Sequence, residues 1–126
     1  EHLIEVRVNG APSRDDAKQI AETIAGSNLV KTCVTGNDPN WGRIASAAGY
    51  AGVPFAVSGF RLFLNEMLLF EGGEPCEFSA QTVSESMANG DTVKIRVELQ
   101  EGSESACIWT SDLTTAYVVF NSDYHT

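Results

Sequence analysis

The sequence has few basic residues and no long apolar run. Eight lysines and arginines stand against seventeen acidic residues in a chain of 126, which gives a formal net charge of −9 at pH 7. Binding to the phosphate backbone of a nucleic acid requires a basic surface, and these basic residues are scattered, so we expect no nucleic-acid partner. No apolar run approaches the roughly 20 residues that a membrane-spanning helix requires, so we expect no membrane partner either.

Cysteine and histidine are also scarce. No two of the cysteines, Cys33, Cys76 and Cys107, have the spacing of a metal site, and His2 and His125 lie at opposite ends of the chain. We therefore expect no metal site, and buried thiols in the reducing cytoplasm. The chain also opens without methionine or a secretion signal and enters a strand pattern at once, so we expect it to be the downstream part of a longer protein.

The apolar residues, 43% of the chain, suffice for the core of one domain and form distinct periodic patterns. A short apolar run at residues 29–34 predicts a strand, and the turn at Glu101-Gly102 joins two further strands. Alternation of apolar and polar residues predicts strands at residues 4–8, 60–64 and 93–99. The turn at Asn65-Glu66 predicts a hairpin between residues 60–64 and residues 67–70. The strands on either side of Glu101-Gly102 are those at residues 93–99 and 105–110.

Apolar residues at helical spacing predict three helices. The first begins after the N-cap Ser13 and ends at Gly26, and the third covers residues 79–89. Between them, Asp38 and Pro39 predict a helix start, with the aspartate as the cap and the proline at the first helical position. At least two strand pairs are joined by turns alone, so the expected fold is α+β. We expect a single domain in two layers, a mixed sheet with helices packed on one side.

Two glycines, Gly42 and Gly49, lie inside the predicted second helix. Each weakens a helix by about 1 kcal/mol relative to alanine, because glycine loses more backbone freedom on folding. A packing reason, or access for another group, would explain them.

Two polar stretches could carry chemistry. The structural interpretation of the first, residues 35–43, is a tight turn and helix cap, in which Asp38 and Asn40 bind backbone amides and Trp41 fills the core. Its functional interpretation is a loop that lines a pocket, with the helix N-terminus and the arginine that ends the stretch facing an anionic group. The second stretch is the polar C-terminus, residues 121–126, which the apolar residues before it would hold against the body.

Several segments of the sequence, taken together and in order, match one known family. They are the opening strand with Gly10-Ala11, Val30-Lys31-Thr32, the run from Gly36 to Arg43, Trp109-Thr110-Ser111-Asp112-Leu113, and the pattern Asn121-x-x-Tyr124-x-Thr126. With these segments, over essentially its whole length, the sequence resembles the ornithine acetyltransferases, also called bifunctional glutamate N-acetyltransferases. A lone Asn-Trp-Gly-Arg would be weak evidence, whereas the ordered set is specific.

The resemblance implies an enzyme of arginine synthesis that is made as one chain and cuts itself ahead of a threonine. That threonine becomes the N-terminal nucleophile of the second chain, takes an acetyl group from N-acetylornithine and passes it to glutamate. Two copies of each chain form a heterotetramer. The resemblance implies no resident cofactor, although acetyl-CoA is a second acetyl donor where the enzyme is bifunctional.

The resemblance places the nucleophile upstream of residue 1, so we expect no catalytic residue in this chain. Residues 1–126 then correspond to the C-terminal domain of the second chain. The family's substrate-contacting glutamate also lies ahead of the first strand, and its role does not transfer to Glu1. Two substrate-binding positions do match, the family's asparagine at Asn121 and its terminal hydroxyl residue at Thr126.

An alternative function is a non-catalytic subunit-assembly module of a related self-processing protein with an N-terminal nucleophile. The residues upstream distinguish the two hypotheses. A threonine preceded by a small-residue cleavage site favours the enzyme, and its absence favours the module.

Overall fold

The computed structural model describes residues 2–112 and the backbone of residues 118–120. The strands form one mixed sheet in the order β4-β3-β2-β5-β1-β6-β7. They are β1 (Leu3–Ala11), β2 (Arg61–Leu64), β3 (Met67–Glu71), β4 (Glu74–Pro75), β5 (Thr92–Glu98), β6 (Glu104–Ser111) and β7 (Val118–Phe120). Strand β1 is central, parallel to β5 on one side and antiparallel to β6 on the other.

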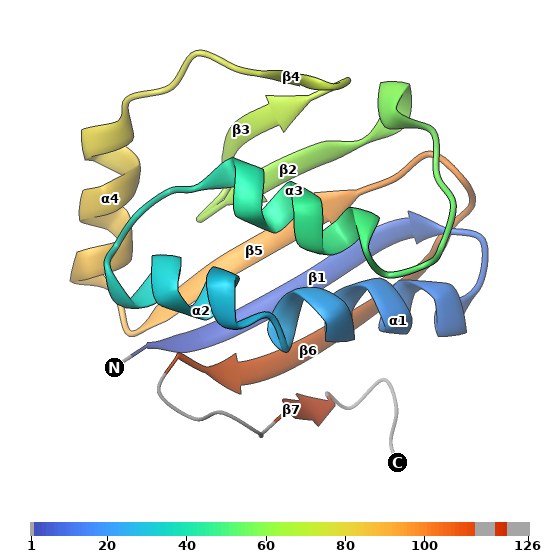
Figure 1. Ribbon diagram of the computed structural model, residues 1–126, viewed down its shortest axis with the longest axis horizontal. Helices are drawn as coiled ribbons and strands as arrows, with labels where there is room; N and C mark the ends of the chain where they lie inside the picture. The colour runs from blue at the N-terminus through green and yellow to red at the C-terminus, as the bar shows by residue number, and fades with distance from the viewer. Residues whose placement is uncertain (1, 113–117, 121–126) are drawn as a thin grey trace.

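Four helices accompany the sheet in the described residues. They are α1 (Arg14–Ala25), α2 (Asn28–Thr35), α3 (Trp41–Gly49) and α4 (Ala80–Asn89), with one 3₁₀ turn, η1, at Val57–Gly59. Figure 1 shows α1, α2 and α3 lying over one face of the sheet, with α4 at one end of it. Helix α1 has 12 residues, and none of the described helices is long and apolar enough to cross a membrane.

The core lies between the sheet and these helices. Val6 of β1 and Ile95 of β5 face each other in register and point into it. From the helix layer, α1 contributes Ile20 and Ile24 and α3 contributes Ile44, all at most 1% exposed. Each such side chain stabilises the fold by about 1.5–3 kcal/mol through its removal from water. The predicted α+β fold, two layers with a mixed sheet and helices on one side, is confirmed.

Residues 29–34 form most of α2, so the strand predicted there is wrong. Ser27 caps this helix by accepting a hydrogen bond from the Val30 N–H at 3.2 Å. The buried apolar residues Val30, Cys33 and Val34 have the i, i+3, i+4 spacing of a helix. A short apolar run fits the strand and helix periods equally, so the run alone does not distinguish them.

The second predicted helix begins later than the sequence indicates. Asp38 and Pro39 are not its cap and first residue, because α3 starts at Trp41 and its N-cap is Asn40. The Asp38 N–H donates a hydrogen bond to the Cys33 carbonyl at 2.9 Å. The backbone at Asp38 is therefore still completing the end of α2 where the sequence predicts the start of the next helix.

The turn at Glu101-Gly102 joins two strands that are not neighbours. Strands β5 and β6 follow one another in the chain, but β1 lies between them in the sheet.

The hairpin predicted at Asn65-Glu66 is confirmed, and both turn residues have the positive φ that such a turn needs, 49° and 68°. Turns therefore connect β2 to β3 and β3 to β4, whereas the centre of the sheet is assembled from distant segments.

The other predicted helices are confirmed. Ser13 caps α1 through a hydrogen bond from the Asp16 N–H at 3.0 Å, and Gly26 ends it. Ser79 caps α4 in the same way and Gly90 follows its last residue.

Candidate functional site

The polar stretch 35–43 runs from the last residue of α2, through the turn at residues 36–40, into the first turn of α3. Asn37 has a positive φ of 53°, and its carbonyl accepts a hydrogen bond from the Ser84 hydroxyl of α4 at 2.8 Å. Asn40 caps α3, because its Oδ1 accepts the N–H of the residue three positions later at 3.1 Å. The Asp38 carboxylate accepts a hydrogen bond from the Asn40 side-chain amide at 3.4 Å. The cap interpretation is thus confirmed for Asn40, and Asp38 supports that cap rather than binding a backbone amide.

Trp41 opens α3 and packs against the core while remaining partly exposed. Its ring stacks on Phe70 of β3, with the centroids 4.9 Å apart and the planes at 18°. A pair of this kind contributes about 0.5–1.5 kcal/mol beyond the burial of its area. The prediction that Trp41 fills the core is confirmed for the packed side of the ring, and the ring also lines an open groove.

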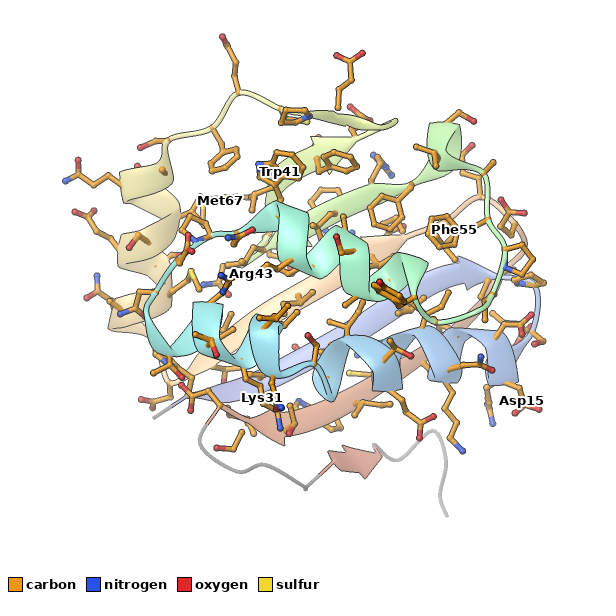
Figure 2. All side chains as sticks on the ribbon, in the orientation of Figure 1. Asp15, Lys31, Trp41, Arg43, Phe55 and Met67 are labelled. Atoms are coloured by element: carbon orange, nitrogen blue, oxygen red, sulfur yellow. The ribbon has the colours of Figure 1, made fainter. Side chains whose placement is uncertain are left out.

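Arg43 leaves this turn toward α2 (Figure 2). Its Nη1 donates to the Leu29 carbonyl at 3.5 Å and to the Cys33 Sγ at 3.2 Å. Arg43 lines a pocket of about 460 Å³ with Ser27 and Asn40, as the functional interpretation requires, but its hydrogen bonds to Leu29 and Cys33 go to α2.

Burial raises the pKa of the Cys33 thiol and outweighs the opposing effect of Arg43, so this thiol is not an activated nucleophile at neutral pH.

A second polar cluster joins segments that are far apart in the sequence. The Asp112 side chain, 1% exposed, accepts hydrogen bonds from the backbone N–H and the Nδ1 of His2, at 2.9 and 3.0 Å. The Thr35 hydroxyl, at the end of α2, lies 3.3 Å from the same carboxylate and 3.0 Å from the Lys31 carbonyl, so these two acceptors share its one proton. The other ring nitrogen of His2, Nε2, lies 2.9 Å from the Met87 carbonyl in the last turn of α4. We refer to His2, Thr35 and Asp112 as the Asp112 cluster.

The partners of His2 define its chemistry in the cluster. An ionised carboxylate and a backbone carbonyl can only accept hydrogen bonds, and each ring nitrogen of His2 faces one of these two acceptors. The cluster therefore ties the start of β1, the ends of α2 and α4, and the segment after β6 through hydrogen bonds around one buried carboxylate and its histidine.

Replacing Asp112 with asparagine is expected to destabilise the protein by about 1–3 kcal/mol at pH 7, because His2 loses its charged acceptor in a buried site. Burial acts to raise the pKa of the Asp112 carboxyl, but the hydrogen bonds from His2 together hold that pKa below its ordinary value. A group of this kind contributes its stability above its unfolded-state pKa of about 4 and loses it as the pH falls through the lower folded-state pKa. The wild type should therefore lose stability more steeply than Asp112→Asn between about pH 5 and pH 2.

Urea unfolding across this pH range measures both effects. Asp91→Asn, at an exposed position just before β5, is the control and should leave the midpoint at pH 7 nearly unchanged. Equal pH slopes in the wild type and in Asp112→Asn would show that Asp112 does not carry the acid dependence.

The two predicted substrate-binding residues, Asn121 and Thr126, lie outside the described residues. The described chain approaches that segment through Asp112 and through β7, whose backbone pairs antiparallel with β6. No group of three or more metal-ligating side chains is present in the part of the chain that the structure describes. The sequence does not predict the Asp112 cluster, because His2 carries no signal by its position. The one available signal is an aspartate directly after an apolar strand, in the motif at residues 109–113.

Comparisons with known proteins agree on one family. The family model described as "ArgJ family" matches residues 1–126. The "Arginine biosynthesis bifunctional protein ArgJ" of Rhodopirellula baltica is 48% identical over 124 residues, which are 98% of this chain and 30% of that protein. The chloroplastic protein of the same name from Citrullus lanatus is 42% identical over 128 residues, 98% of this chain and 28% of that protein.

A solved structure is similar as well. The crystal structure of the arginine biosynthesis bifunctional protein argJ from Bacillus halodurans has a TM-score of 0.86 and 37% identity, over 90% of this chain and 53% of that chain. The chain thus spans less than a third of the length of these two curated relatives. These matches confirm the resemblance to the ornithine acetyltransferases, and this chain belongs to the ArgJ family.

Proposed function

We propose that this chain is the C-terminal domain of the second chain of a self-processed ornithine acetyltransferase. The full-length protein that carries it, hereafter the complete protein, transfers an acetyl group from N-acetylornithine to glutamate through an acyl-threonine intermediate. Residues 1–126 contribute no catalytic residue and complete the substrate pocket through Asn121 and Thr126. The enzyme acts in arginine synthesis, in the cytoplasm.

The observation that supports this proposal most is the match of the whole chain to proteins named arginine biosynthesis bifunctional protein ArgJ, of which it forms less than a third. In proteins of that length, the nucleophile and the cleavage site have room outside these residues. The described side chains are consistent with a nucleophile that lies outside residues 1–126. Cys33 is a buried thiol with a raised pKa, and Asp112 is committed to His2 and Thr35.

The transfer has two steps. The threonine hydroxyl attacks the acetyl carbonyl of N-acetylornithine, an ester forms as the amide bond breaks, and the released ornithine amine takes the proton. The glutamate amine then attacks the ester, forms N-acetylglutamate and returns the proton to the threonine oxygen. Preorganised donors stabilise the oxyanion in both steps. Asn121 and Thr126 bind the carboxylate and ammonium groups of these amino-acid substrates, for which a side-chain amide and a hydroxyl are suitable partners.

The Asp112 cluster supports a binding role for the segment that follows it. Asp112 directly precedes residues 113–126, and its side chain is held by His2 and Thr35 in a buried position. Pairing of β7 with β6 gives the segment a second attachment. Productive substrate binding requires functional groups with a defined geometry toward the body of the enzyme, and Asn121 directly follows β7 in the sequence.

The proposal extends to the assembly of the complete protein. Two copies of its α chain and two of its β chain form a heterotetramer, with N-acetylornithine, ornithine and glutamate as substrates or products. The reaction needs no resident cofactor. Acetyl-CoA serves as a second acetyl donor if the complete protein is bifunctional, as the names of its relatives state of them.

Deleting Thr126 from the complete protein is expected to raise KM for N-acetylornithine by about 10- to 100-fold, because a hydrogen bond to a charged group of the substrate is lost. Self-cleavage should still occur, since its chemistry lies upstream of this chain. Steady-state kinetics and gel electrophoresis of the cleaved chains measure the two effects. His125→Ala, at a position outside the family pattern, is the control, and an unchanged KM after the deletion would contradict contact between the terminal residue and the substrate.

A further inference from the structure

An open apolar groove of about 380 Å³ runs along α3 on the side that faces β2 and β3, where Figure 2 shows Trp41 and Phe55. One wall is a row of rings. Trp41 stacks on Phe70 with the centroids 4.9 Å apart, and Phe55 stacks on Phe60 at 5.2 Å. Val57, which also lines the groove, is 55% exposed. The fold therefore orders an aromatic wall and leaves an apolar side chain uncovered beside it.

The other wall of the groove is a face of α3 with small side chains. Gly42, Ala45, Ser46 and Gly49 line it, at the i, i+3, i+4, i+7 spacing of one helix face. Among the residues that line the groove, Ser46 alone has an aliphatic hydroxyl and none is charged. A helix packs on another helix by placing its ridges of side chains in such a channel. The chemistry and shape of the groove thus fit an apolar helix.

The two glycines of this wall have no packing reason within the described chain. Neither has a positive φ. A Cβ built on Gly49 would meet no atom within 4 Å, and one built on Gly42 would meet the Asn40 side chain at 3.4 Å, an ordinary contact. Alanine would favour the helix at both positions. A segment that approaches the α3 backbone more closely than a methyl group permits would account for both glycines.

We propose that this groove receives a helix with large apolar side chains from the part of the complete protein that lies outside residues 1–126. The relatives are long enough to supply it, because this chain corresponds to 30% of the Rhodopirellula baltica protein and to 53% of the Bacillus halodurans chain. The inference rests on the proposed function only in taking the complete protein to be as long as these relatives. It needs no particular chemistry at the active site.

Photo-crosslinking of the complete protein identifies the occupant directly. With p-benzoylphenylalanine in place of Val57, illumination should join the groove to a peptide of the same protein that lies outside residues 1–126. A crosslink to residues 1–126 of a second copy would overturn the proposal in favour of a self-association surface. The absence of any protein crosslink would overturn it in favour of an open groove. Acetyl transfer is not the readout, so an inactive protein that gives the expected crosslink would count against the proposed function alone.

A stability measurement tests the close approach independently. Gly49→Leu is expected to lower the melting temperature of the complete protein by about 3–6 °C, because the added side chain occupies the space of the docked helix. Ala88→Leu, also a change to leucine on an exposed helical position, is the control and should shift it by no more than about 1 °C. An unchanged or raised melting temperature for Gly49→Leu would overturn the proposal, since leucine forms helix better than glycine on a free surface.

Discussion

Replacing Asn121 with alanine in the complete protein is expected to lower kcat/KM for N-acetylornithine by about 30- to 100-fold, with self-cleavage still going to completion. A side-chain amide that binds a charged group of the substrate contributes about 1.5–3 kcal/mol, and alanine removes both its donor and its acceptor. Initial rates at several substrate concentrations measure the loss, and the ratio of cleaved to uncleaved chain measures processing.

The neighbouring Ser122 provides a matched control for this prediction. It lies in the same C-terminal stretch but is not one of the residues of the pattern Asn121-x-x-Tyr124-x-Thr126. Ser122→Ala should therefore retain the wild-type kcat/KM. Wild-type kinetics in Asn121→Ala would remove this residue from the substrate site. Loss of cleavage together with activity would show that Asn121 acts in processing or folding instead.

Gly10→Ala is expected to destabilise the protein by about 3 kcal/mol, roughly a 100-fold change in the folding equilibrium. Gly10 has a φ of +81°, and an added Cβ would collide with the Leu99 carbonyl. This approach is part of how β1 and the loop after β5 fit together, because the Gly10 carbonyl accepts the Glu101 N–H at 2.9 Å and the Asn9 carbonyl accepts the Leu99 N–H at 2.8 Å. Relieving the collision would break these hydrogen bonds.

Urea unfolding of Gly10→Ala and of Gly36→Ala separates this effect from the general cost of replacing a glycine. Gly36 has a φ of −87°, and a Cβ built on it would lie 3.6 Å from the Thr32 carbonyl oxygen, an ordinary contact. Gly36→Ala should therefore change the unfolding midpoint little. Equal midpoints in the two variants would contradict the requirement for glycine at position 10.

The sequence predicts the local features of this fold well because their causes are local. Ser13, predicted as a cap, accepts a hydrogen bond from the N–H three residues later, and Ser79, predicted as the first residue of its helix, does the same as the cap of α4. The hairpin at Asn65-Glu66 depends on two adjacent residues that tolerate positive φ. The alternation at residues 93–99 predicts β5 for the same reason, since its period belongs to the strand itself.

The sequence does not predict features that depend on distant partners. Residues 29–34 fit a strand or a helix until α2 is packed against the rest of the core, where Val30 and Val34 are buried. The place of β1 between β5 and β6 is a pairing between segments nearly the whole chain apart. His2 and Asp112 have a sequence separation of 110, so their hydrogen bonds leave no local pattern.

The candidate site shows the same difference between local features, which the sequence predicts, and contacts between distant residues, which it does not. The family motifs predict Asn121 and Thr126 as substrate-binding residues by their position in a pattern, without a physical argument for their geometry. The turn at residues 35–43 is recognisable as a cap, although the capping residue is Asn40 and not Asp38. That Thr35, the last residue of α2, lies within hydrogen-bond distance of the same carboxylate as His2 becomes apparent only once the chain is folded.

Mass spectrometry of the complete protein mixed with N-acetylornithine, with no glutamate present, tests the proposed function most directly. The acyl-threonine mechanism predicts one acetyl group on the N-terminal threonine of the second chain. Addition of glutamate should then remove that group and form N-acetylglutamate. A complete protein that stays uncleaved and unacetylated, and that forms no N-acetylglutamate, would contradict the assignment of this chain to a self-processed acetyltransferase.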